Sequence, residues 1–321
     1  VTGGKNIFIN TELIIEAEDY REYASVLAHE LAHILGGHIF RTSEEISNIT
    51  SKALPIYLLG IVGLIAGSTE AGFAGVMVGQ AAVNDTFTYY SRTQEAAADQ
   101  KAVSILCNNM IDAIHLANFL ESLDSSMPNI DSKVENYRST HPLPKERIDW
   151  IKLALNNNKK CNFDIDKNLE QRFNLLRAKL FGYTHSYDET KAVYNSNDNK
   201  DLYANAVASY INGDHIQSTK NLKILIEKDN NNPFFKELIG EIYFINQKYE
   251  KAIYFHKGAM NKLNSESDIY MMMLGNYLLS TDERDKVRES INYLKKSIRI
   301  NPENTYSWYL LAKAYAYIDN I

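Results

Sequence analysis

The chain has 321 residues, enough for about two domains at the usual domain size. Its composition, 45% hydrophobic and 23% charged, is that of a globular protein and excludes a disordered, collagen-like or disulfide-scaffold chain. With 34 basic against 40 acidic side chains the net charge is −6, so we expect no nucleic-acid partner. The two cysteines, Cys107 and Cys161, could form one disulfide, and the sequence leaves their pairing open.

The first residues predict a strand rather than a helix. Residues 4–10 alternate polar and apolar side chains and follow a glycine, which favours a short strand. No later segment has a convincing strand pattern, so we expect a sheet that is truncated at its N-terminal side. The chain also starts at Val1 without a targeting segment, and we expect that a signal peptide has been removed or lies outside this sequence.

The following segments have helical patterns. Apolar residues recur at helical spacing between Glu18 and Phe40, with Gly36 and Gly37 weakening the helix towards its end. Residues 53–84 hold a single charge and two apolar stretches, each too short to cross a bilayer, which favours a helical hairpin. This hairpin is a buried pair, a lid over a cleft or a surface that contacts lipid. Further helices are predicted over residues 93–107, 110–123 and 145–155.

From residue 199 onward the chain repeats itself with a period of 34 residues. The small residues Ala206 and Gly240 are one period apart, as are Ser218 and Ala252. Small residues at fixed positions allow two helices to approach closely, and each helix pair then buries its open face on the next pair. The pattern resembles the tetratricopeptide repeat and predicts an α-solenoid over residues 199–321, with a non-repeating helical bundle as the alternative.

The sharpest motif is His29-Glu30-Leu31-Ala32-His33 in the long predicted helix. Residues four apart share a helix face, so both imidazoles can reach one metal ion, with Glu30 beside them. Two histidines, one further protein ligand and an open position suit Zn²⁺, which acidifies bound water. Glu30 would then accept a proton from that water during attack on a peptide carbonyl.

The third ligand must come from elsewhere in the chain. A histidine six residues after His33 would be typical of metzincins, but that position is Ile39, and His38 comes one residue early. The predicted helix over residues 93–107 offers Glu95 and Asp99, four residues apart with alanines between them. We assign Glu95 to the metal, and Asp99 to a hydrogen bond that fixes a ligand imidazole.

Together these motifs resemble a known family. The HELAH motif, the segment from Tyr90 to Asp99 and Ser139-Thr140-His141-Pro142 followed by Arg147 are similar to the gluzincin peptidases of the HtpX and CAAX-prenyl-protease clan. With the repeats attached, the chain is most similar to the BepA-type (YfgC-like) periplasmic zinc proteases of Gram-negative bacteria. The resemblance implies a periplasmic enzyme, associated with the outer membrane, that degrades misassembled β-barrel proteins and assists their assembly.

The resemblance also implies roles for further residues. His141 and Arg147 match catalytic-site positions of the family, and His141 is expected to lie near the metal, where it could occupy the fourth site and keep the resting enzyme latent. His38 matches a position where the family often has histidine, without an assigned role. The expected strand provides a substrate-binding edge, formed by Lys5, Asn6, Ile7, Phe8 and Ile9.

The predicted fold is therefore mainly α, with three parts. Residues 1–155 form a gluzincin metallopeptidase domain of α+β type that includes the apolar hairpin 53–84, residues 156–198 a helical linker, and residues 199–321 the repeats.

The predicted function is that of an endopeptidase with one Zn²⁺ per chain, acting on unfolded or misassembled envelope proteins. Its repeats are expected to bind the outer-membrane β-barrel assembly machinery, and residues 53–84 are a candidate membrane contact. The alternative is a binding scaffold or chaperone whose metal site is latent or silent. A membrane-embedded peptidase is disfavoured by the short apolar stretches.

Overall fold

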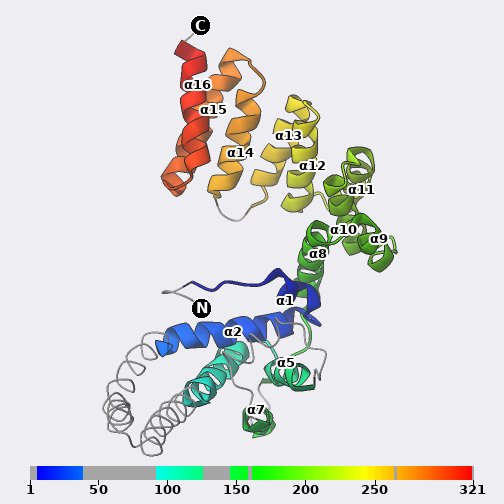
Figure 1. Cartoon of the computed structure of the whole chain (residues 1–321), viewed down its shortest axis with the longest axis vertical. Coiled ribbons are helices and arrows are strands. Elements are labelled where there is room, and N and C mark those ends of the chain that lie inside the picture. Colours follow the sequence, from blue (N-terminus) through cyan, green and yellow to red (C-terminus); the bar gives the residue numbers. More distant parts are fainter. Residues whose placement is uncertain (1–5, 39–91, 126–144, 158–160, 264–265, 320–321) are drawn as a thin grey trace, which may run out of the picture. The chain divides into compact units, whose positions relative to one another are not determined.

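A computed structural model describes residues 6–38, 92–125, 145–157, 161–263 and 266–319 (Figure 1). All regular elements among these residues are helices, which confirms the prediction of a mainly α fold. The chain divides into two compact units, residues 1–173 and residues 174–321. None of the helices in the described ranges has the length and apolar character needed to cross a bilayer.

The first unit contains a small set of helices. They are α1 (Thr11–Glu16), α2 (Tyr20–Gly36), a helix over residues 92–108, α5 (Ile114–Ser125), α7 (Lys145–Asn157) and the start of α8 (Lys167–Thr184). The helices predicted from periodicity are therefore confirmed, with boundaries that differ by a few residues.

Helix α2 has clear signals at both ends. The Asp19 side chain accepts hydrogen bonds from the backbone N–H groups of Arg21 and Glu22, which caps the first turn. At the other end Gly37 has φ of 65° and its N–H bonds back to the carbonyls of His33 and Ile34. This left-handed conformation suits glycine and stops the helix.

A shared apolar core joins α2, the helix over residues 92–108, α5 and α7. Its side chains are Val26 and Ala28 from α2, followed by Ala102, Leu106, Ala113, Leu116, Ala117, Phe119, Leu120, Ile148 and Ile151. Helix α5 contacts both α2 and α7. The core fixes the backbone of α2 against that of residues 92–108, the two helices that carry the expected metal ligands.

A disulfide closes the first unit. Cys107, near the end of the helix over residues 92–108, bonds to Cys161, and their Cα atoms are 5.0 Å apart. The pairing that the sequence left open is thus formed. The disulfide closes a loop whose ends are 54 residues apart in the sequence.

The predicted strand over residues 4–10 is wrong for the part that the structure describes. Residues 6–10 belong to no regular element, and Phe8 is 74% exposed. Alternation predicts a strand only where a neighbouring strand accepts its backbone hydrogen bonds, and the described residues hold no strand. The expected substrate-binding edge of Asn6, Ile7, Phe8 and Ile9 therefore lacks a strand, and Lys5 lies outside the described residues, as does the apolar hairpin over residues 53–84.

The second unit is an array of helices that follow one another along the chain (Figure 1). Its elements are the end of α8, α9 (Tyr187–Val193), α10 (Asn199–Ile211), α11 (His215–Lys228), α12 (Pro233–Ile245), α13 (Tyr249–Met260), α14 (Asp268–Leu279), α15 (Arg284–Ile300) and α16 (Thr305–Asp319). The strongest contacts join α10 with α11, α12 with α13 and α14 with α15. Stacked helix pairs are the arrangement expected of tetratricopeptide repeats.

The small residues of the 34-residue period lie where paired helices approach closely. The Ser218 hydroxyl of α11 donates to the Ala206 carbonyl of α10 at 2.6 Å. One period later, a Cβ atom added at Gly240 of α12 would lie 3.4 Å from the Ala252 carbonyl of α13. Both contacts are backbone approaches that a large side chain would prevent. The boundary between the two units falls inside α8 and inside the expected linker 156–198.

Candidate metal centre

Helix α2 presents two histidines to one point. His29 and His33 are one helical turn apart, and their Nε2 atoms are 3.0 Å from each other. Both residues are buried, at 0% and 8% exposure. Their spacing of four residues places both on one face of the helix, and that face is buried.

Glu95 reaches the same point from the helix over residues 92–108. Its Oε2 atom is 3.2 Å from His29 Nε2, and its Oε1 atom is 3.2 Å from His33 Nε2. The carboxylate is buried as well, at 3% exposure. Three potential ligand atoms from two helices thus converge in the interior of the first unit.

The converging atoms fit a metal ion. One ligand atom from each of His29, His33 and Glu95 lies within 4.8 Å of the other two. Ligand atoms at tetrahedral corners with bonds of about 2.0–2.1 Å are separated by roughly 3.3 Å, close to the distances seen here. Two imidazoles and a carboxylate are also a donor set typical of catalytic metal sites in peptidases.

The ring nitrogens on the far side of both histidines are engaged too. Asp99 Oδ1 lies 3.0 Å from His29 Nδ1. His33 Nδ1 lies 2.9 Å from the Nδ1 atom of His38, which is buried at 7% exposure. A hydrogen bond at one ring nitrogen fixes which tautomer leaves the other nitrogen free to bind a metal. Each of these contacts therefore bears on a candidate metal ligand.

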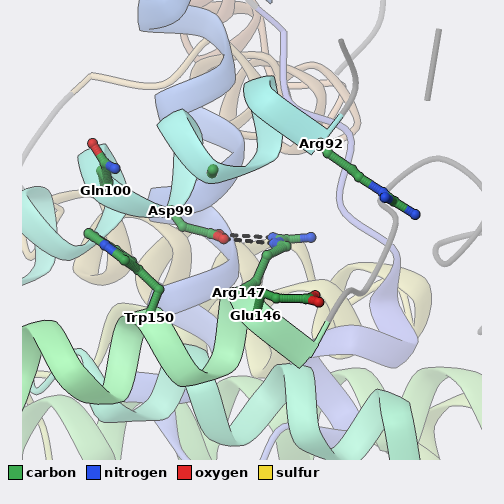
Figure 2. Close-up of a pocket in the computed structure, with 7 residues that line it drawn as sticks. Arg92, Asp99, Gln100, Glu146, Arg147 and Trp150 are labelled. Carbon is green, nitrogen blue, oxygen red and sulfur yellow. Dashed lines mark hydrogen bonds and ion pairs between the residues drawn. The ribbon is translucent and has the colours of Figure 1, made fainter. Parts of the chain in front are cut away.

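Arg147 of α7 joins the two carboxylates. Its Nε and Nη2 atoms donate to Asp99 at 2.7 and 2.8 Å, and its Nη1 atom lies 3.0 Å from Glu95 Oε2. Figure 2 shows the carboxylate of Asp99 facing the guanidinium of Arg147 between two helices. The paired geometry is the strong bidentate form of an arginine–carboxylate contact. Arg147 thus holds Glu95 and Asp99 in position. The family resemblance placed Arg147 in the catalytic site but did not specify these two contacts.

These contacts change the proton affinity of the buried groups. Burial alone would lower the pKa of His29, but hydrogen bonds and charges from Asp99 and Glu95 outweigh it and raise the pKa to about 9. Burial alone would raise the pKa of Asp99, yet Arg147 and His29 hold it below its ordinary value. The pKa of about 9 keeps His29 protonated at neutral pH, between the carboxylates of Asp99 and Glu95.

A cavity of about 400 Å³ lies against the Asp99–Arg147 pair. Its other lining residues are Arg92, Ala96, Gln100, Glu146 and Trp150 (Figure 2). None of the three candidate metal ligands lines it. The cavity therefore borders the residues that support the ligands and lies apart from the ligand atoms themselves.

The remaining predicted site residues stand as follows. Glu30 follows His29 on α2 and is half-buried. His141 lies outside the described residues, so its expected place near the metal stays a prediction. The sequence interpretation gave no role to His38, and the sequence signal that could have done so is the glycine pair directly before it.

The comparison with known families agrees with this geometry. Residues 1–154 match the family model of Peptidase family M48. The matched range includes His29, Glu30, His33, Glu95, Asp99 and Arg147. The resemblance to a peptidase family seen in the motifs is therefore confirmed over these residues.

Three curated relatives are similar to the chain over different lengths. The beta-barrel assembly-enhancing protease of Yersinia pestis is 24% identical over 98% of this chain and 64% of its own length. The protein of the same name in Escherichia coli K12 is 22% identical over 99% of this chain and 65% of its own length. A putative beta-barrel assembly-enhancing protease of Vibrio cholerae is 31% identical over 45% of this chain and 30% of its own length. The chain thus spans about two thirds or less of these relatives.

Proposed function

We propose that the chain is a zinc endopeptidase that degrades unfolded or misassembled envelope proteins and assists the assembly of outer-membrane β-barrels. The observation that carries the proposal is the convergence of His29, His33 and Glu95 at 3.0–3.2 Å in the buried centre of the first unit. Two imidazoles and a carboxylate gathered at one buried point are the donor set typical of catalytic zinc sites, which favours a bound cation there.

His29, His33 and Glu95 would hold the ion, and their nitrogen and oxygen donors suit Zn²⁺. When bound, zinc polarises a carbonyl group and makes water more acidic. Glu30 is the residue proposed to take the proton from the attacking water and to pass it on to the leaving amine. Asp99 and Arg147 keep the ligands in place, and His141 remains the proposed fourth group of a latent resting state.

Substrates and location are inferred from the relatives and from the disulfide. The relatives are named for enhancing β-barrel assembly, and similarity extends over both units of this chain. The Cys107–Cys161 disulfide favours an oxidising compartment, such as the periplasm. The stacked pairs α10–α15 are proposed to be tetratricopeptide repeats that bind clients or the β-barrel assembly machinery.

Replacing the proposed general base tests the enzymatic function. The variant Glu30→Gln keeps the side-chain size and leaves all three ligands intact, but it cannot accept the proton. We expect at least about a hundredfold lower cleavage of an unfolded protein such as casein, while bound zinc stays at one ion per chain. Cleavage is followed by gel electrophoresis, and zinc by elemental analysis of the purified full chain.

Two controls make the result decisive. A chelator should abolish cleavage by the unchanged protein, and added zinc should restore it. Glu16→Gln, an exposed carboxylate on α1, should cleave like the unchanged chain. If purified, zinc-loaded protein cleaves nothing, or if Glu30→Gln cleaves normally, the enzymatic proposal is wrong and a binding scaffold with a silent metal site becomes the better explanation.

A further inference from the structure

The two histidines of the candidate metal centre are supported in different ways. His29 has a carboxylate, Asp99, at its Nδ1 atom, whereas His33 has the imidazole of His38 there. Metal-binding histidines commonly donate the proton of their second nitrogen to such a partner. For His33 the partner must itself lack a proton at the contacting nitrogen, which the neutral imidazole of His38 provides at Nδ1 when its proton is on Nε2.

His38 can reach His33 only because the helix stops between them. Residues five apart on a continuous α-helix are about 140° apart around its axis, so they do not face each other. Gly37, with φ of 65°, ends α2, so His38 does not continue its helical path. The buried ring of His38 then lies beside the last turn of the same helix that carries His33.

Gly36 supplies the space for this ring. A Cβ atom added at Gly36 would lie 2.4 Å from His38 Nε2 and 2.7 Å from Cδ2, closer than real Cβ contacts occur. A Cβ atom added at Gly37 would meet nothing within 4 Å. The two glycines therefore have different roles. Gly36 leaves space for the His38 ring, and Gly37 adopts the left-handed conformation that ends the helix.

We propose that His38 is a positioning residue for the metal ligand His33, and that Gly36 is required for this role. The Nδ1–H of His33 donates to His38 Nδ1, which leaves His33 Nε2 unprotonated and directed at the same point as His29 and Glu95. The inference rests on the proposed metal site, and it adds a residue for which the peptidase motif gives no role.

The first test compares two variants of similar size. His38→Asn places an amide oxygen near the position of Nδ1 and can still accept the hydrogen bond, whereas His38→Leu cannot. We expect the zinc Kd of the full chain to rise about 10- to 100-fold for His38→Leu, the usual loss when such a partner is removed. For His38→Asn it should stay much closer to the original value. Competition with a chelating dye measures both.

A second test uses the neighbouring glycines. Gly36→Ala should weaken zinc binding because its methyl group displaces the ring, whereas Gly37→Asn should keep the Kd, since asparagine tolerates the left-handed conformation. In a His38→Ala background, Gly36→Ala should have no further effect on the Kd. Such a double-mutant cycle assigns the effect to the contact between the two residues.

Nitrogen NMR of the His33 ring gives a readout that fold stability alone does not move. We expect a hydrogen-bonded Nδ1–H in the zinc-loaded chain and in His38→Asn, and a shifted Nδ1 resonance in His38→Leu. Equal zinc affinities for the Leu and Asn variants, or an unchanged Kd for Gly36→Ala, would overturn the proposal. If the unchanged chain binds zinc but cleaves nothing, the proposed function fails while the role of His38 is still decided by these affinities.

Discussion

Arg147 is the cationic partner of two buried carboxylates, those of Glu95 and Asp99. It pairs with Asp99 and Glu95 in an environment where all three side chains are at most 4% exposed. Arg147→Ala leaves both carboxylates without this partner, and we expect a loss of about 3–5 kcal/mol in the stability of the metal-free protein. Arg147→Lys keeps the charge but loses the bidentate geometry, so its loss should be smaller.

Urea unfolding of the metal-free full chain, followed by circular dichroism, measures both losses. Lys101→Ala, an exposed change on the helix that carries Glu95, is the control and should shift stability by less than about 0.5 kcal/mol. Equal stability of Arg147→Ala and Lys101→Ala would show that the buried pair contributes nothing.

The raised pKa of His29 predicts how the stability of the metal-free protein changes with pH. Its pKa of about 9 in the folded chain lies above its ordinary value of 6.5. Protonated His29 therefore stabilises the folded state fully below about pH 6.5, and this contribution, of the order of 3 kcal/mol at most, is lost as the pH rises through 9. Urea midpoints of the chelator-treated chain at pH 6 and pH 9.5 measure the loss, which His29→Gln should reduce. A midpoint that rises with pH in the unchanged chain, and not in His29→Gln, would contradict it.

At the scale of the helices, two glycines of the second unit occupy comparable places but differ in the space around them. An added Cβ at Gly275 of α14 would lie 2.7 Å from Leu294 Cγ of α15, whereas one at Gly240 of α12 would lie 3.4 Å from its nearest neighbour. Alanine favours a helix over glycine by about 1 kcal/mol. We expect Gly240→Ala to be neutral or stabilising, and Gly275→Ala to destabilise by about 1–2 kcal/mol because it overpacks the buried contact.

Thermal unfolding of the two variants distinguishes these effects. Gly240→Ala serves as the control for helix propensity, because both substitutions add the same methyl group to a helix interior. A Gly275→Ala variant at least as stable as Gly240→Ala would mean that Leu294 moves aside at little cost.

The helices themselves illustrate what local sequence can predict. The sequence predicts the α2 region because its apolar spacing and its glycine pair agree, and the structure adds a cap at Asp19. The strand over residues 4–10 failed because a strand depends on a partner that its own sequence does not contain. Helices satisfy their hydrogen bonds within the segment, so their prediction needs less information from the rest of the chain.

At the scale of the whole molecule, the disulfide is confined to the first unit. Cys107 and Cys161 are 54 residues apart in sequence, and closing such a loop stabilises the folded state by about 4 kcal/mol in the chain-entropy account. We therefore expect a Cys107→Ser, Cys161→Ser chain to lose hydrogen-exchange protection in α5 and in the helix over residues 92–108. Protection in α12 and α13 should not change, because the cross-link constrains only the first unit.

Mass spectrometry of exchanged peptides gives the comparison within one sample, with the second unit as the internal control. The same result is expected when the unchanged protein is treated with a reductant. Equal protection with and without the disulfide would show that packing alone holds the first unit together.

Spacing and periodicity along the sequence indicate the residue types of the candidate metal centre, the helices that carry them and the 34-residue period of the second unit. Periodicity and spacing are local properties, so they can be recognised along the sequence without knowledge of tertiary contacts. The tertiary structure alone decided the Cys107–Cys161 pairing, the contacts of Arg147 with both carboxylates and the place of His38 beside His33. These depend on how separate segments approach and on the point where Gly37 ends α2, and no single segment encodes such distances.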